Sequence, residues 1–142
     1  MSWQRAISLW QPWCFAITHL GKDVENRTWS TRHRGPVVLH AAKRRPTREE
    51  CESFLDLAAS IIGEDELLDQ LAQVTKVQGR LIDALRALPR GGLVAIVDVV
   101  GCVTTSRSPW AFDGQYHWQL ANARAVPFRE VRGQRGFFPV VL

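Results

Sequence analysis

The sequence has few cysteines and no long hydrophobic run. Its three cysteines, Cys14, Cys51 and Cys102, are far apart and odd in number, and no C-x-x-C pair occurs. We therefore expect free thiols rather than a disulfide framework. No stretch approaches the roughly 20 apolar residues that a membrane span needs, and the first residues run into a core-like segment without a secretory signal. These absences predict an intracellular, cytoplasmic protein with no membrane partner.

Several common chemical motifs are also absent. The sequence contains no G-x-x-x-x-G-K-[ST] phosphate loop, no G-x-G-x-x-G motif, no H-E-x-x-H and no G-x-S-x-G. The classes of nucleotide-binding protein, metalloprotease and serine hydrolase that carry these motifs are therefore not indicated. The four histidines and three cysteines are never three or four positions apart, as the ligands of a local metal site would be. We predict neither a metal nor a cofactor.

What the chain does have is charge, unevenly distributed. Its 142 residues include 18 Lys and Arg against 14 Asp and Glu, a formal net charge of +4. Residues 49–75 hold eight of the acidic residues and no Lys or Arg, so this segment has a charge of −8 and the rest of the chain has +12. The length suits one domain, 1–142, with a core that needs no disulfides. The basic part predicts an anionic partner such as nucleic acid.

Residues 46–89 are predicted to form a helical insertion within that domain. Thr47 is placed to cap a helix and Glu50 to complete a capping box. Apolar residues at helical spacing follow, and we expect Gly63 to end the helix. A second apolar stripe, which includes Val77, continues to Pro89. We interpret the acidic residues as a solvated helix face; the alternative is an acidic flap that competes with nucleic acid for the basic body.

Outside the insertion the sequence predicts mainly strands. Pro12 suits the first turn of a helix that runs to Ile17 and ends at Gly21. The expected strands are 6–9, 24–29, 36–41, 93–100, 116–120 and 137–142. We thus predict an α+β fold, in which a small β-barrel is flanked by helices.

The strand expected at 24–29 carries the most informative side chains. Alternation places Glu25, Arg27 and Trp29 on one face. A carboxylate, a guanidinium and a large flat ring are unsuited to an apolar core, but they suit a site that reads the polar edge of a base and stacks its ring. The alternative is an ion pair between Glu25 and Arg27 on an outer face, with Trp29 covering the end of the barrel.

At this point the sequence resembles the ASCH domain, which is named after the activating signal cointegrator and belongs to the PUA-like superfold. The similarity skips most of the insertion. The matching runs are L-W-Q-P-W at 9–13, G-K-x-x-E-x-R at 21–27, R-G at 34–35, H-A-A-K at 40–43, L-P-R-G at 88–91, Y-H-W-Q-L at 116–120 and G-Q-R-G-F-F at 133–138. Several spaced motifs therefore agree in order along the chain.

The resemblance implies a closed PUA-like β-barrel whose cleft is lined by residues 21–27, and in such clefts relatives bind RNA, DNA or modified nucleotides. Some members are hydrolases, and one branch removes the acyl group of acetylated cytidine with a Lys and a Thr of this segment and a later Glu. Lys22 matches that Lys, but Glu25 occupies the Thr position, so the expected nucleophile is missing. We predict that Thr28 points to the face opposite Glu25 and cannot simply replace it.

Three functions are compatible with these features. The first is binding of nucleic acid (RNA or DNA), or of a nucleotide, in a basic cleft. The alternative is a hydrolase of a modified nucleoside or of RNA, of ribonuclease or amidohydrolase type, with Lys22 and Glu25 as catalytic residues. The third is an interaction module that works through the insertion. The expected ligand-binding residues are Trp13, Lys22, Glu25, Arg27, Trp29, His40, Lys43, Arg44, Tyr116 and Trp118.

These candidates divide by the chemistry of their side chains. Lys22 and Lys43, with nearby arginines, are expected to meet phosphate groups, whereas Glu25 and Arg27 read a base. His40 ends an apolar strand, so a satisfied core histidine is the alternative to a ligand contact. A further row of basic residues, expected to follow a nucleic-acid backbone, consists of Arg124, Arg129, Arg132 and Arg135.

Overall fold

The computed structural model describes residues 2–76 and 79–142, which form six strands and four helices. Val77, which the sequence places in the second apolar stripe, lies outside the described residues. The strands are β1 (Trp3–Leu9), β2 (Val24–Arg27), β3 (Gly35–Ala41), β4 (Gly92–Val103), β5 (Tyr116–Glu130) and β6 (Phe138–Val141). The helices are α1 (Trp13–His19), α2 (Arg48–Ile62), α3 (Glu64–Val74) and α4 (Leu81–Arg86). The predicted α+β class is confirmed.

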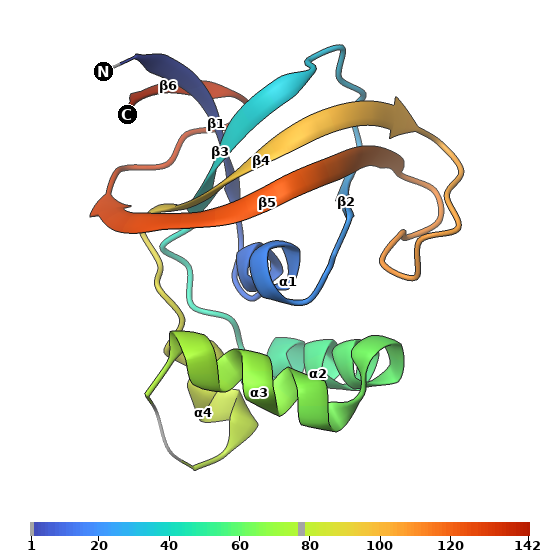
Figure 1. Cartoon of the computed structure of the whole chain (residues 1–142), viewed down its shortest axis with the longest axis vertical. Coiled ribbons are helices and arrows are strands. Elements are labelled where there is room, and N and C mark those ends of the chain that lie inside the picture. The colour runs from blue at the N-terminus through green and yellow to red at the C-terminus, as the bar shows by residue number, and fades with distance from the viewer. Residues whose placement is uncertain (1, 77–78) are drawn as a thin grey trace.

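The strands pair in one mixed sheet in the order β2-β5-β4-β3-β1-β6 (Figure 1). β1 and β3 run parallel, with Ser8 opposite His40, and the other neighbours are antiparallel. β3 and β4 are central because their side chains are largely apolar; Val37 and Val97, for example, are buried opposite each other. Among the described residues, β2 and β6 are the two edges of the sheet, so the pairings do not show the closed barrel that the sequence predicts.

β5 is much longer than the sequence predicts. Residues 116–120 form only its beginning. Residues 121–130 are mostly exposed and combine alanine, arginine and Pro127, a composition that does not indicate a strand. They belong to the sheet because β4 pairs with β5 along its length. β2, by contrast, ends at Arg27, two residues before the predicted boundary at Trp29.

Within the predicted helical segment 46–89, the described residues form α2, α3 and α4, which make a layer on one side of the molecule (Figure 1). The Thr47 side chain accepts a hydrogen bond from the Glu50 backbone N–H (3.1 Å), and the Glu50 carboxylate accepts one from the Thr47 N–H (2.9 Å). This is the predicted capping box. Gly63, with φ of 87°, ends α2 immediately before α3, because glycine adopts this conformation without steric cost.

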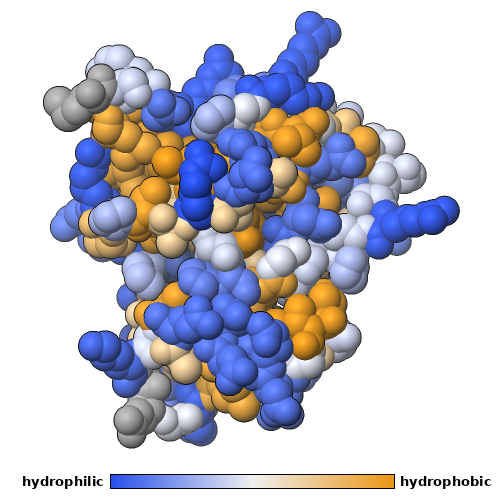
Figure 2. Space-filling view, in the orientation of Figure 1, coloured by the Kyte–Doolittle hydropathy of each residue, from blue (hydrophilic) through white to orange (hydrophobic). Residues whose placement is uncertain are grey.

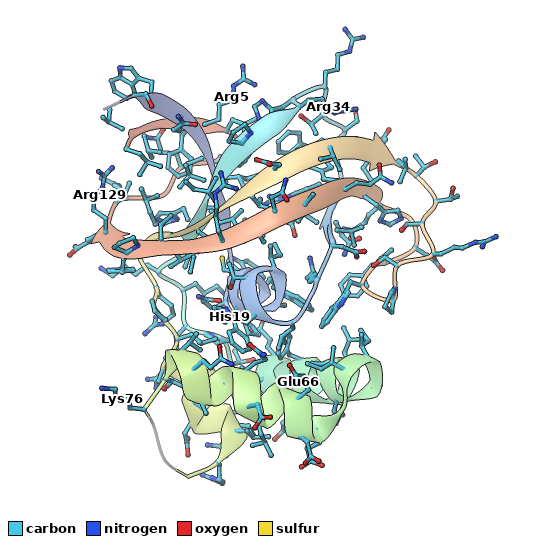
Figure 3. The ribbon with its side chains drawn as sticks, viewed as in Figure 1. Arg5, His19, Arg34, Glu66, Lys76 and Arg129 are labelled. Atoms are coloured by element: carbon cyan, nitrogen blue, oxygen red, sulfur yellow. The ribbon has the colours of Figure 1, made fainter. Side chains whose placement is uncertain are left out.

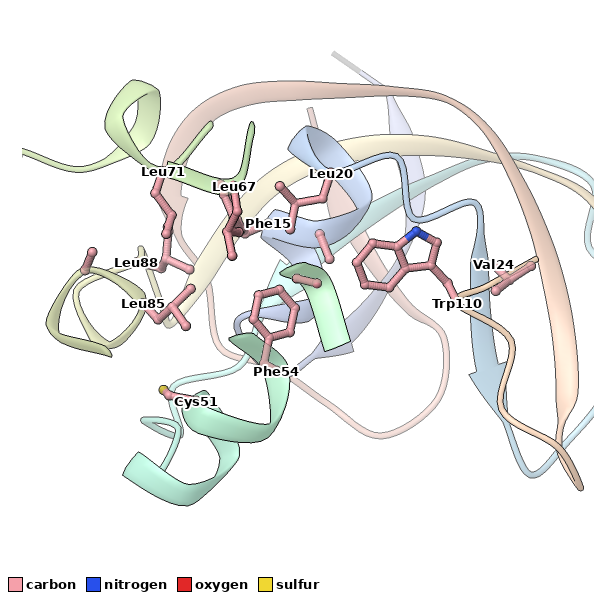
Figure 4. Close-up of a cluster of buried hydrophobic side chains, with 13 residues drawn as sticks. Phe15, Leu20, Val24, Cys51, Phe54, Leu67, Leu71, Leu85, Leu88 and Trp110 are labelled. Carbon is pink, nitrogen blue, oxygen red and sulfur yellow. The ribbon is translucent and has the colours of Figure 1, made fainter. Parts of the chain in front are cut away.

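A hydrophobic cluster joins the helical layer to the sheet through α1 (Figure 4). Phe15 of α1, Phe54 of α2, Leu67 of α3 and Leu85 of α4 are buried in it, together with Trp110 from the loop before β5. The acidic residues of the layer lie outside the cluster: seven of the eight are exposed, and hydrophilic atoms cover much of the visible face of the layer (Figure 2). This arrangement fits the solvated face rather than the flap.

The two ends of the chain lie side by side (Figure 1). β1 and β6 are antiparallel neighbours at one edge of the sheet. Ser2 and Leu142 exchange two backbone hydrogen bonds, of 3.0 and 3.1 Å. The beginning and the end of the chain are thus part of the same ladder.

Candidate functional site

A cavity of about 520 Å³ opens where the end of β1, the start of α1 and β2 meet the loop before β5. It combines charged side chains with several aromatic rings, and we call it the aromatic cavity. Its lining residues are Ser8, Leu9, Trp10, Trp13, Lys22, Glu25, Asn26, Arg27, Thr28, Trp29, Phe112 and Gln115.

Three charged side chains form a continuous network in this cavity. Lys22, which precedes β2, is only 3% exposed; its ammonium donates to the Val24 carbonyl (2.5 Å) and to Oε1 of Glu25 (3.3 Å). Oε2 of Glu25 accepts from Nε of Arg27 (2.9 Å). Arg27 Nη2 donates in turn to the Ser8 carbonyl (3.0 Å). Glu25 is therefore held from both sides by charge-assisted hydrogen bonds.

The surroundings of Lys22 change its acid–base behaviour. Burial lowers the pKa of Lys22 below its ordinary value of 10.5, and the neighbouring Glu25 carboxylate partly offsets this effect. The Trp13 ring lies 5.5 Å from the ammonium, a contact that favours the charged form. Burial is the larger effect, so Lys22 releases its proton more readily than a surface lysine does. The charged ammonium can donate hydrogen bonds, and the neutral amine can act as a general base.

The aromatic walls are fixed by contacts between rings. Trp13 packs edge-to-face against Phe54 of the helical layer (5.3 Å) and against Phe112 (5.8 Å). Trp29 packs edge-to-face against the buried Trp118 (4.7 Å). Held rings beside a carboxylate and a guanidinium are the combination that stacks a base and reads its edge.

The structure brings five of the predicted ligand-binding residues together. Those that line the aromatic cavity are Trp13, Lys22, Glu25, Arg27 and Trp29. Trp29 does so from the segment that follows β2, and not through strand alternation as predicted. Thr28 also lies beyond the end of β2, where strand alternation does not apply, and it lines the same cavity as Glu25.

His40 and Lys43 line a second cavity, of about 670 Å³, which we call the basic cavity. Its lining residues are Ser8, His40, Ala42, Lys43, Arg90, Gly91, Phe128, Glu130, Val131, Arg132, Gly133, Gln134 and Arg135. The His40 ring is 2% exposed, and its nitrogens lie 2.9 Å from Oγ of Ser8 and 2.6 Å from the Val131 carbonyl. His40 is therefore the satisfied core histidine that was the alternative to a ligand contact.

Three further predicted residues line neither cavity. Arg44 pairs with the capping-box carboxylate of α2 (2.7 Å), and its guanidinium lies 4.1 Å from the centre of the Trp10 ring. Tyr116, at the start of β5, lines a separate hollow with Arg34. Trp118 is 1% exposed and supports the aromatic cavity from behind. Tyr116 and Trp118 are two positions apart on β5, but Tyr116 is exposed and Trp118 is buried, so strand alternation does not predict their burial.

The sequence did not indicate the loop that closes the aromatic cavity. Phe112 and Gln115 come from this loop. Asn26 of β2 holds it in place: Nδ2 donates to the Trp110 carbonyl (3.0 Å), and Oδ1 accepts from the Phe112 backbone N–H (3.1 Å). Because Asn26 and Trp110 are 84 positions apart, no local pattern signals their contact.

Within residues 2–76 and 79–142, no group of three or more His, Cys, Asp and Glu side chains is arranged to hold a metal ion. No helix in the same residues is long and apolar enough to cross a membrane.

Burial raises the pKa of the Cys14 thiol far above its ordinary range, so Cys14 is not a reactive group.

Comparison with known proteins points to one family. The family model described as the ASCH domain matches residues 7–129, a range that contains the whole lining of the aromatic cavity. A curated relative, "Activating signal cointegrator 1" of Mus musculus, is 26% identical over 98 residues. That match covers 69% of this chain and 14% of the relative, so the chain spans a small part of the relative's length. The chain belongs to the ASCH domain family.

Proposed function

We propose that the chain binds RNA or DNA, or a nucleotide, by taking a base into the aromatic cavity. The observation that carries this proposal is the placement of Glu25 and Arg27 among fixed aromatic rings. The charge of the chain outside residues 49–75 supplies a long-range attraction to phosphates. Membership of the ASCH family supports the same function, and it supports a PUA-like arrangement for the curved sheet.

The charged network has hydrogen-bonding capacity left for a base. Each carboxylate oxygen of Glu25 accepts one bond from the protein and has a second lone pair. Arg27 uses Nε and Nη2 within the protein, while Nη1 carries two further N–H donors. An acceptor beside a donor is complementary to the edge of a base that presents an amino group beside a ring nitrogen.

Fluorescence anisotropy with labelled single-stranded RNA and DNA of about ten nucleotides tests this proposal. Trp10 lines the aromatic cavity and is 51% exposed, so Trp10→Ala removes a stacking surface without opening the core. Since stacking contributes about 1–3 kcal/mol per base, we expect Kd to rise roughly 5- to 150-fold. Trp3, 72% exposed and outside this cavity, provides the matched control Trp3→Ala, which should bind like wild type.

Glu25→Gln tests the reading of the base edge separately from stacking. The substitution keeps the shape of the side chain but replaces one acceptor oxygen by a donor, so affinity should fall for some bases more than for others. Binding to homopolymers of each base measures this effect, and a thermal unfolding curve confirms that the variant folds. Failure of wild type to bind either RNA or DNA at low salt would reject the proposal, as would equal losses in the two tryptophan variants.

A hydrolase is the second candidate function. The lowered pKa of Lys22, which is buried in the same cavity as the carboxylate of Glu25, favours it. In this case Lys22 accepts a proton from water as the water oxygen attacks the acyl carbon of an N-acylated nucleoside, and it returns the proton to the amine that leaves when the C–N bond breaks. With RNA the water oxygen attacks phosphorus, and the proton goes to the ribose oxygen that leaves when the P–O bond breaks. Chromatography of N-acylated cytidine and of short RNA after incubation tests for turnover, which Lys22→Met should abolish. An unchanged rate in Lys22→Met would exclude this role.

A further inference from the structure

The basic cavity is formed by three segments that are distant in the sequence. His40 and Lys43 come from β3 and the residues after it, and Arg90 precedes β4. The segment from Phe128 to Arg135 comprises the exposed end of β5 and the residues that follow it. The cavity contains four basic side chains and one carboxylate, Glu130. Its volume of about 670 Å³ exceeds that of the aromatic cavity.

The cations of this cavity differ from three cations in or beside the aromatic cavity. Lys22, Arg27 and Arg44 are each paired with a carboxylate. In the described part of the chain, by contrast, no ion pair involves any of the four basic residues of the cavity, which are Lys43, Arg90, Arg132 and Arg135. With four basic side chains and one carboxylate, the cavity therefore carries a net positive charge.

Arg90 adds a second sign that an acceptor is missing. Its Nη1 donates to the Lys43 carbonyl (2.6 Å), which holds the guanidinium against the chain after β3. Its Nε is buried and has no hydrogen-bond partner among residues 2–76 and 79–142. Buried polar atoms in native proteins are normally satisfied, so an orphaned guanidinium N–H indicates a place for an ion or a water molecule.

The floor of the basic cavity is a fixed structure. A carbonyl accepts hydrogen bonds only, so the 2.6 Å contact with Val131 requires a proton on Nε2 of His40, and in the neutral ring Ser8 then donates to Nδ1. Gly133 lies over the ring, where a Cβ atom would be 2.7 Å from Cε1 of His40. The Val131 N–H also donates to the Gly91 carbonyl (3.2 Å). The segment that carries Arg132 is thus anchored to the floor.

Ser8 connects the two cavities, because it lines both of them. Its carbonyl accepts from Arg27 on the side of the aromatic cavity, and its hydroxyl bonds to His40 on the side of the basic cavity. A ligand that places a base beside Arg27 therefore has the net positive charge of the basic cavity on the other side of Ser8.

We infer that the basic cavity is a phosphate-binding subsite, which takes a phosphate group of the nucleic-acid strand whose base enters the aromatic cavity. This inference rests on the proposed function, since that function supplies the strand. Guanidinium groups match phosphate geometry through paired N–H donors, and three of the four cations are arginines. An oligonucleotide should accordingly bind far more tightly than the corresponding free nucleoside.

Salt-dependent binding of a labelled single-stranded oligonucleotide tests the subsite. The test variant is Arg132→Gln/Arg135→Gln, because both side chains are exposed and their loss leaves the core intact. The control is Arg80→Gln/Arg107→Gln, which removes the same charge from exposed positions outside both cavities. We expect the test variant to lose about tenfold or more in affinity at low salt and to reduce the slope of log K against log salt by about 1. The control should change affinity less than about twofold.

Each outcome separates the subsite from the proposed function. If wild type binds the oligonucleotide and the test variant matches the control, the subsite is rejected and the proposed function stands. If wild type binds no oligonucleotide, the proposed function fails, and thermal shift with inorganic pyrophosphate then decides the subsite. Stabilisation that the test variant loses and the control keeps would retain a phosphate site there; absence of stabilisation would reject it.

Discussion

Lys22 donates a hydrogen bond to Glu25 across 3.3 Å from a side chain that is almost completely buried. Such a pair is costly to break, because removing one partner leaves the other charge buried and uncompensated. Glu25 also accepts from Arg27, so the carboxylate is common to both cations. The stability of this corner of the fold and the binding of a base that we propose there therefore depend on the same atoms.

A double-mutant cycle should reveal this dependence. Glu25→Ala leaves the Lys22 ammonium without its carboxylate, so we expect the free energy of unfolding to fall by about 1–3 kcal/mol. Adding Lys22→Met removes the buried charge, and the double variant should lose less than the two single variants together, with a coupling of about 0.5–3 kcal/mol. Urea denaturation followed by tryptophan fluorescence measures each term. Strictly additive losses would show that the two side chains are not coupled.

His19 should make the fold sensitive to mild acid. It lies at the end of α1, on the side of the helical layer (Figure 3), and stacks on Phe15 with ring centres 5.2 Å apart. Burial lowers its pKa below the ordinary value of 6.5. As the pH falls below about 6.5, the unfolded state takes up a proton before the folded state does. The free energy of unfolding therefore decreases from about pH 6.5 down through the lower pKa of the folded state.

The variant His19→Gln tests this contribution. Urea denaturation near pH 7.5 and pH 5 should show a smaller acid-induced loss of stability in the variant than in wild type, because the variant lacks the titrating group. At neutral pH and above, the difference between the free energies of unfolding of the variant and of wild type should stay constant. Equal losses in both proteins would assign the acid sensitivity to other groups.

The capping box of α2 should contribute measurably to stability. Thr47→Ala removes the acceptor for the Glu50 N–H, and the loss of an N-cap typically costs about 1 kcal/mol. Thr47→Ser keeps the hydroxyl and should remain close to wild type. Thermal and urea unfolding of the two variants give the comparison. A serine variant as unstable as the alanine variant would contradict the capping role.

Gly133→Ala should disturb the floor of the basic cavity. The added methyl group would lie 2.7 Å from Cε1 and 3.0 Å from Nδ1 of His40, a ring with no room to move. We expect a loss of about 1–3 kcal/mol and a changed NMR signal for the His40 ring nitrogens. Gln134→Ala, at the next and exposed position, should stay within about 0.5 kcal/mol of wild type. An unaltered His40 signal in Gly133→Ala would count against the contact.

Sequence patterns predicted the parts of the fold that depend on local signals. The start of α2 at Thr47, its end at Gly63 and the apolar strands β3 and β4 are of this kind. The second half of β5 is exposed and carries arginines, so only its pairing with β4 makes it a strand. The strand propensity of residues 121–130 does not predict this, because the hydrogen bonds that make them a strand come from β4.

The candidate site could be predicted only where its residues are close in the sequence. Lys22, Glu25 and Arg27 share one short segment and do lie together. Lys43 and Arg44 are adjacent, yet one lines the basic cavity and the other stacks on Trp10. The lining from Arg90 and from residues 128–135 depends on tertiary contacts that no spacing rule describes.

Because Ser2 and Leu142 are hydrogen-bonded to each other, the order of the strands and helices along the chain can be changed while their arrangement in space is kept. Because the ends meet at one edge of the sheet, a short Gly/Ser linker can join them. New ends can then be opened in the exposed segment at residues 104–107, between β4 and β5, as circular permutation requires. Such a permutant would keep both cavities while moving the points of attachment, so a fluorophore or a fused protein could be placed on either side of the ligand.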